Sequence, residues 1–89
     1  MLNGATAPKA LNPQEVIVEA LDTVTLKVQI DELPPKVMTL NIDQIQTFKA
    51  KGSLKLTISN GGAVNVIHNG NDLGVPGNLG QAKTLTFPQ

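Results

Sequence analysis

The sequence predicts an all-β protein, specifically a small antiparallel immunoglobulin-like β-sandwich of about seven strands. Three observations support this prediction. Apolar and polar residues alternate over short segments, turn-forming residues separate these segments at intervals of roughly eight to twelve residues, and no segment shows the helical period of about 3.6 residues. With 89 residues, the chain has room for one domain built around one hydrophobic core.

The first 14 residues differ from the rest of the chain. They mix small residues with Pro8 and Pro13 and follow neither a strand nor a helix period. We therefore interpret residues 1–14 as a linker or tail and residues 15–89 as the β-sandwich domain.

Two strands are predicted at the start of the domain, over residues 15–21 and 23–30. Asp22 and Thr23 offer a tight connection between them, so the pair is predicted to form a first hairpin. The side chains expected to face the core are Val16, Val18, Ala20, Val24, Leu26, Val28 and Ile30.

A break follows at Leu33-Pro34-Pro35, because proline has no amide donor and restricts the residue before it. Strands are predicted beyond it over residues 37–42 and 45–50, separated by Asp43 and Gln44. Their expected inward side chains are Met38, Leu40, Ile42, Phe48 and Ala50.

The next two strands, residues 53–58 and 63–68, flank the turn sequence Ser59-Asn60-Gly61-Gly62. Asn-Gly between alternating segments is a strong hairpin signal, since both residues tolerate positive φ. A hairpin is therefore predicted here, and valine at Gly61 or Gly70 should cost about 1 kcal/mol or more if that glycine has positive φ. The inward side chains would be Leu54, Leu56, Ile58, Val64 and Val66.

Residues 69–80 are rich in glycine and contain Pro76, so a loop is predicted before a last strand over residues 82–87. Leu85 and Phe87 should face the core from that strand. The residues assigned to structural turns are Asn60, Gly61, Gly62, Asn69, Gly70, Gly74, Gly77 and Gly80.

Composition removes several classes of function. Seven lysines balance seven carboxylates and arginine is absent, which argues against nucleic acid as a partner. The absence of cysteine excludes disulfides and thiolate metal sites. No window approaches the roughly 18 apolar residues of a transmembrane helix, so direct membrane insertion by this domain is not expected.

His68 and Asp72 are the first candidates for chemistry, as an acid–base pair or half of a metal site. The simpler interpretation places His68 at the end of a strand and Asp72 in a turn. No second histidine and no nucleophile motif accompanies them. Glu15 and Glu19 could resemble paired glycosidase carboxylates, but with the strand period of two they fall, together with Ile17, on the solvated face of their strand. We therefore predict no catalytic residue, no cofactor and no metal.

A few side chains assigned to outward faces could instead contact a partner. Ile17, Val37 and Ile67 are aliphatic residues at such positions, although single exposed aliphatic residues are common. The candidate interaction face is formed by Thr25, Lys27 and Ile67.

The segment GSLKLTISNGGAVNVIHNG, residues 52–70, followed by Leu73-Gly74, resembles the C-terminal extracytoplasmic domain of RodZ-type bacterial cell-shape proteins. That domain typically shows a strand, a glycine-containing turn, Ala-Val, a second strand, Asn-Gly and a glycine-containing loop. The resemblance covers roughly residues 15–88, but only residues 52–80 carry a distinctive motif. Family members often have tryptophan where Thr25 stands, so the resemblance does not carry over an aromatic contact at that position.

The resemblance implies a module outside the cytoplasmic membrane, in a single-pass inner-membrane protein that links the MreB cytoskeleton to peptidoglycan synthesis. The expected partners are protein components of the cell-elongation machinery, with no catalysis. One alternative is a glycan- or peptidoglycan-binding module in which Asn69, Asn71 and Asp72 contact sugar hydroxyls, although no aromatic platform accompanies them. An enzyme that uses His68 and Asp72 is the third hypothesis.

Overall fold

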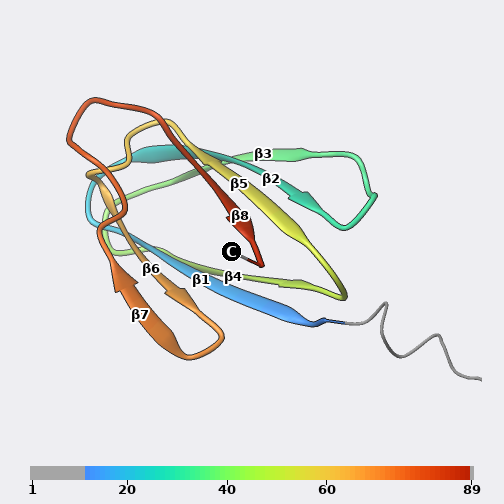
Figure 1. Ribbon diagram of the computed structural model, residues 1–89. Coiled ribbons are helices and arrows are strands. Elements are labelled where there is room, and N and C mark those ends of the chain that lie inside the picture. The colour runs from blue at the N-terminus through green and yellow to red at the C-terminus, as the bar shows by residue number, and fades with distance from the viewer. Residues whose placement is uncertain (1–11, 89) are drawn as a thin grey trace, which may run out of the picture.

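The computed structural model describes residues 12–88 and contains eight strands arranged in two four-stranded antiparallel sheets (Figure 1). The predicted all-β sandwich is confirmed. The strands are β1 (Gln14–Ala20), β2 (Val24–Ile30), β3 (Lys36–Leu40), β4 (Ile45–Ala50), β5 (Leu54–Ile58), β6 (Val64–His68), β7 (Asn71–Gly74) and β8 (Lys83–Phe87).

One sheet has the strand order β4-β1-β6-β7 and the other β3-β2-β5-β8. The first strand therefore pairs with the fourth, and the second with the fifth, in opposite sheets. This is how the B–E and C–F strand pairs of immunoglobulin-like sandwiches are divided between their two sheets. The strand β7 is additional to the predicted strands and lies within the segment predicted to be a loop.

The core lies between the two sheets and is built from the inward side chains of alternating strand positions. Nearly all of the predicted inward residues are confirmed there. Phe87, which closes β8, is the largest fully buried side chain. The buried apolar residues are Val16, Val18, Ala20, Val24, Leu26, Val28, Leu40, Phe48, Ala50, Leu54, Leu56, Ile58, Ala63, Val64, Val66 and Phe87. Ile30, Met38 and Leu85 pack against this core but remain partly exposed.

Ile42 is an exception, because the prediction that it faces the core is wrong. Strand β3 ends at Leu40, and Ile42 is 59% exposed in the turn that follows. In this turn the Gln44 side-chain oxygen accepts a hydrogen bond from the Asn41 amide at 2.7 Å, and Asp43 has a φ of 70°. Because the strand ends at Leu40, the alternation that would have buried Ile42 does not extend to it.

The predicted first hairpin is also wrong, because β1 and β2 belong to different sheets. The chain between them passes from one sheet to the other. The Leu21 amide donates to the Ala63 carbonyl at 2.7 Å, and the Thr23 amide donates to the Asp22 side chain at 2.8 Å. Alternation shows which face of a strand is buried, but it does not identify the neighbouring strand.

The second predicted hairpin, between residues 53–58 and 63–68, fails for the same reason. Strand β5 lies in the β3-β2-β5-β8 sheet and β6 in the other, so residues 59–63 cross between the sheets. Asn60 holds this crossing in place, because its side-chain oxygen accepts hydrogen bonds from the amides of Gly62 at 3.2 Å and Gly80 at 2.9 Å. The Gly61 amide donates to the Gln81 carbonyl at 2.7 Å.

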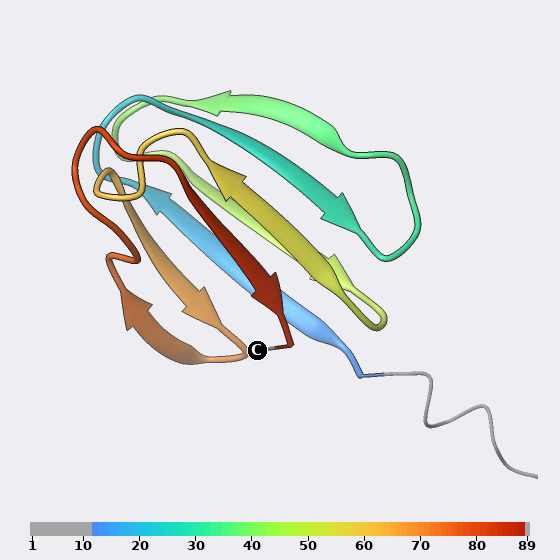
Figure 2. The ribbon, with the colours of Figure 1, turned by 45° about the horizontal axis from the view of Figure 1, so that its top comes forward.

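The other Asn-Gly pair forms the actual hairpin. Asn69 and Gly70 have φ values of 48° and 83°, and His68 pairs directly with Asn71 across them. Two consecutive residues with positive φ are the requirement of a type I′ turn. The β6–β7 hairpin that results can be followed in Figure 2.

Glycine is required for a different reason in the crossing between β5 and β6. Gly61 and Gly62 are not among the residues with positive φ, so the predicted strain at Gly61 is absent. A Cβ atom added at Gly62 would instead lie 2.4 Å from the Leu79 amide nitrogen. The two segments can approach this closely only because Gly62 has no side chain.

The boundary of the predicted linker also shifts. Gln14, which we assigned to the linker, begins β1, and it is only 2% exposed. The Asn12 amide donates to the Lys51 carbonyl at 2.8 Å, so the domain already includes this residue. The remainder of the predicted linker, residues 1–11, lies outside the described residues, as does Gln89.

The carboxylate of Asp31, directly after the C-terminal end of β2, binds the β4–β5 connection. Asp31 accepts hydrogen bonds from the consecutive amides of Lys51 at 2.9 Å, Gly52 at 2.7 Å and Ser53 at 3.0 Å. These donors stabilise the charged form, the Lys51 amide most strongly, and they lower the pKa of Asp31 below its ordinary value of 3.8.

This contact should make the stability depend on pH. Because the folded-state pKa of Asp31 is lowered, its stabilisation is complete above the unfolded-state pKa and is lost as pH falls through the folded-state pKa. We expect the Tm of the wild type to fall more steeply than that of Asp31→Asn between about pH 5 and pH 2. Thermal unfolding followed by circular dichroism measures both curves. Parallel curves would contradict the assigned role of Asp31.

Candidate functional site

His68 and Asp72 do not form a pair, because they face opposite sides of their sheet. His68 continues the inward positions of β6, where its Nε2 atom lies 2.5 Å from the Gln14 side-chain oxygen and its ring centroid 4.3 Å from that of Phe87. Asp72 pairs with Ile67 and therefore lies on the outer face. The histidine thus fills the edge of the core, whereas Asp72 belongs to the surface.

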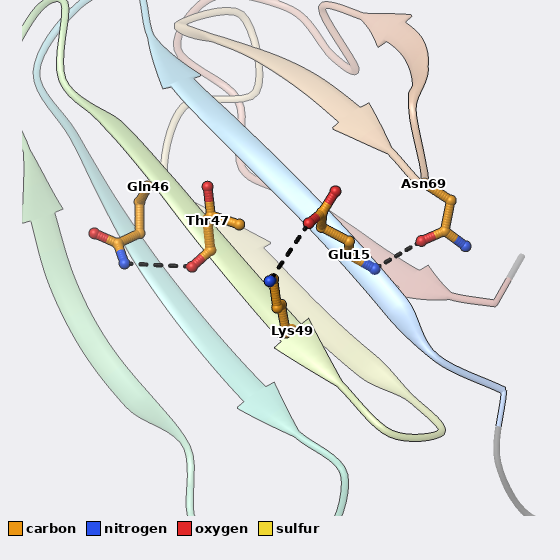
Figure 3. A network of polar contacts seen from close by, with 5 residues as sticks. All are labelled: Glu15, Gln46, Thr47, Lys49 and Asn69. Atoms are coloured by element: carbon orange, nitrogen blue, oxygen red, sulfur yellow. Dashed lines mark hydrogen bonds and ion pairs between the residues drawn. The ribbon is translucent and has the colours of Figure 1, made fainter.

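Glu15 and Glu19 lie on the outer face of β1, as the simpler interpretation predicted. The Glu15 carboxylate is 3.9 Å from the Lys49 ammonium on the neighbouring strand β4, and both side chains are well exposed (Figure 3). An ion pair with this exposure contributes little to stability. The contact is a common cross-strand pair and provides no arrangement for glycoside hydrolysis.

The candidate interaction face is divided between the two sides of the sandwich. Thr25 and Lys27 are exposed on β2, in the β3-β2-β5-β8 sheet, whereas Ile67 lies on β6 in the other sheet. Ile67 is instead the direct cross-strand neighbour of Ile17. These three residues therefore cannot contact one partner through one flat surface.

The candidate glycan-contact residues lie at the β6–β7 hairpin, where Asn69 joins the turn to β1 and Asp72 joins β7 to β6. The Asn69 side-chain oxygen accepts from the Glu15 amide at 2.7 Å, a contact drawn in Figure 3. One Asp72 carboxylate oxygen accepts from the Gly74 amide at 2.8 Å and the Asn65 side chain at 3.2 Å. Asn71 is exposed at the start of β7. Contacts within the β4-β1-β6-β7 sheet thus account for the Asn69 and Asp72 side chains without a sugar ligand.

A first uncovered surface is the outer face of the β3-β2-β5-β8 sheet, which we name the threonine–lysine face. The cross-strand register places its side chains in rows that run across the four strands. The face consists of Thr25, Lys27, Gln29, Val37, Thr39, Lys55, Thr57, Thr84 and Thr86. Thr25 and Lys27 were predicted from the sequence to contact a partner, but only strand pairing shows which residues surround them.

A second surface lies at one end of the sandwich, where the β1–β2, β3–β4, β5–β6 and β7–β8 connections meet (Figures 1 and 2). Backbone hydrogen bonds join these segments, including those from Asp43 to Ala20 and from Gly61 to Gln81. Five exposed apolar side chains occur along the connections or beside them, and we call this group the apolar end. Its members are Leu21, Ile42, Ile45, Val75 and Leu79.

The apolar end was not identified from the sequence. Its residues are single apolar positions within polar or glycine-containing segments, so no periodic pattern links them. Leu79 is 76% exposed and Ile45 is 61% exposed, values that are high for large aliphatic side chains. An isolated apolar residue inside a predicted turn was the available signal, and its meaning depends on which turns come together.

Within residues 12–88, no group of three or more histidine, aspartate or glutamate side chains is arranged to hold a metal ion. The same residues contain no helix that is long and apolar enough to cross a membrane. Comparisons with protein-family models, with curated proteins and with solved structures found no match.

Proposed function

We propose that this chain is a noncatalytic extracytoplasmic interaction module of a membrane-anchored cell-shape scaffold of the RodZ type. The observation that supports this most is the motif in residues 52–80, which resembles that family. Part of the motif also has a structural explanation. The Asn60 side chain binds the Gly80 amide, and Gly62 allows the β5–β6 crossing to pack closely against residues 78–79. Packing thus accounts for Asn60 and Gly62, two residues of the turn within this motif.

The apolar end is the surface that we assign to a protein partner. Protein interfaces depend on a few apolar anchors within a polar rim. Ile42, Ile45 and Leu79 provide exposed aliphatic groups at this end, and Asp22 and Asp43 lie in the same connections. The proposed partners are protein components of the cell-elongation machinery, on the periplasmic or membrane side.

Deletion of this domain from its parent protein in the host tests the proposal as a whole. We expect altered cell width, impaired elongation and reduced recovery of elongation proteins with the tagged parent. A parent lacking the domain that supports normal width, elongation and partner recovery would argue decisively against the proposal.

Point variants test the assigned surface. Ile42→Ser together with Leu79→Ser should lower partner affinity at least about tenfold, because truncating apolar anchors commonly costs more than 1 kcal/mol. Recovery of cross-linked partner from cells measures this effect. Leu33→Ser is the matched control, since Leu33 is 60% exposed in the β2–β3 turn, compared with 59% for Ile42.

The Leu33→Ser control should leave recovery unchanged. Both variant proteins should unfold within about 0.5 kcal/mol of the wild type, because the changed side chains are exposed. Equal loss of partner from the control and the double variant would place the docking surface elsewhere.

A further inference from the structure

The threonine–lysine face combines rows of threonine hydroxyls with two lysine ammonium groups. Its rows run across the sheet by direct pairing, as in Val37–Lys27–Thr57–Thr84. Hydroxyl groups are neighbours within the rows: the side-chain oxygens of Thr25 and Thr39 are 3.4 Å apart. The side-chain oxygens of Thr57 and Thr84 are 3.5 Å apart, so hydroxyl groups lie close together in two of the rows.

The charged groups on this face are both cationic. Lys27 pairs with Thr57 and Lys55 pairs with Gln29, so the two lysines are diagonal neighbours, for which the separation is about 7–8 Å. No carboxylate belongs to the face. The carboxylates lie on the opposite face or in connections, at Glu15, Glu19, Asp22, Asp31, Glu32, Asp43 and Asp72.

Lys27 and Lys55 also border a depression of about 110 Å³, together with Gln29, Pro35 and Thr57. Because a water molecule occupies about 30 Å³ of liquid volume, the depression has room for a carboxylate group with one or two waters. Two ammonium groups and the Thr57 hydroxyl can donate hydrogen bonds to such a group. The depression therefore combines suitable size, charge and donors for one anionic group.

The surroundings of the depression distinguish between possible anions. A protein partner would need apolar or aromatic contacts at the centre of its interface, and Val37 is the only apolar residue of this face. Threonine hydroxyls, which both donate and accept hydrogen bonds, suit a ligand that is itself rich in hydroxyl groups. Charge and hydroxyl content together favour an anionic carbohydrate over an acidic protein.

We propose that the threonine–lysine face binds a carboxylate-bearing glycan strand, with a carboxylate in the depression between Lys27 and Lys55 and sugar hydroxyls on the neighbouring threonines. This surface is separate from the apolar end and needs none of its residues. Glycan binding here and protein docking there can therefore each fail without affecting the other.

An NMR titration of the whole chain with oligogalacturonate, a carboxylated glycan, tests the proposal. We expect saturable shifts of the amide signals of Lys27, Lys55 and Thr57, and none at the β6–β7 hairpin. A neutral chito-oligosaccharide of the same length, a poly-glutamate peptide and sodium acetate are the comparison ligands. None of them combines hydroxyls and carboxylates on one strand, so each should bind at least about tenfold more weakly.

Matched variants distinguish binding by this face from attraction to the overall charge of the protein. Lys27→Gln with Lys55→Gln should weaken oligogalacturonate binding about fivefold to tenfold, because each exposed lysine–carboxylate contact contributes a small factor. Lys49→Gln with Lys83→Gln changes the net charge equally but alters no residue of the face, so the affinity should be retained. Thr57→Val, which removes one hydroxyl at nearly constant shape, should also weaken binding.

Several results would overturn the proposal. An equal loss of oligogalacturonate affinity in the two lysine double variants would show that the binding is nonspecific electrostatic attraction. If poly-glutamate bound as tightly as oligogalacturonate, the face would bind an acidic protein surface. If the amide signals shifted with protein concentration in the absence of ligand, the face would bind a second copy of this chain. Absence of shifts at Lys27 and Lys55, in a protein with an otherwise unchanged spectrum, would remove the site.

Discussion

Replacing Gly62 by alanine is expected to lower the free energy of unfolding by about 1–3 kcal/mol, the usual cost of overpacking. The new Cβ atom would lie 2.4 Å from the Leu79 amide nitrogen and 2.7 Å from the Asn78 carbonyl carbon. Both neighbours are backbone atoms, so relief requires the β7–β8 connection to move away from the β5–β6 crossing. Urea unfolding followed by circular dichroism measures the change.

Gly70→Ala is the control for this substitution, because it tests glycine conformation without crowding. Gly70 has a φ of 83°, but a Cβ atom there would meet no atom within 4 Å. Its expected cost is about 1 kcal/mol, from the left-handed backbone alone. If Gly62→Ala proved no more destabilising than Gly70→Ala, the close approach at Gly62 would not constrain the fold.

Phe87→Ala should cost about 3–5 kcal/mol, the largest effect that we expect from a single side chain. Phe87 is fully buried in β8, opposite Leu54, and its ring contacts that of His68. A small domain has limited stability, so this variant should be substantially unfolded at moderate temperature.

Thr86→Ala is the matched control on the same strand, because Thr86 is exposed on the outer face. Its cost should stay below about 1 kcal/mol, within the range of strand preference. Thermal unfolding of the two variants gives the comparison. Similar losses in both would mean that β8 contributes through its backbone pairing and not through the Phe87 side chain.

The contact between the β5–β6 crossing and the β7–β8 connection links the stability of the fold to the proposed docking surface. Gly62 and Asn60 hold the β5–β6 crossing against the loop that carries Leu79, a member of the apolar end. Destabilising this contact should disturb the apolar end before it affects the threonine–lysine face, which consists of paired strands. The two proposed surfaces therefore differ in their dependence on loop packing.

Local pattern in the sequence was sufficient to predict seven of the eight strands and most of the buried positions, but it missed β7 and wrongly placed Ile42 in the core. Alternation correctly identified β4 as residues 45–50, and it placed Val16, Leu26 and Val66 in the core. These features depend on the period of two within one strand, which is present in the sequence itself. The same period places His68 in the inward series of Val64 and Val66.

Strand partners, and the residues that share a surface, were decided by tertiary structure. Asn60-Gly61 and Asn69-Gly70 are the same dipeptide, yet the first crosses between sheets and the second closes a hairpin. The pairing of a strand depends on contacts with residues distant in sequence, so identical turn residues can serve either connection. For the same reason, the separation of Thr25 from Ile67, and the meeting of the connections that carry Ile42 and Leu79 at one end of the sandwich (Figure 1), became visible only in the folded chain.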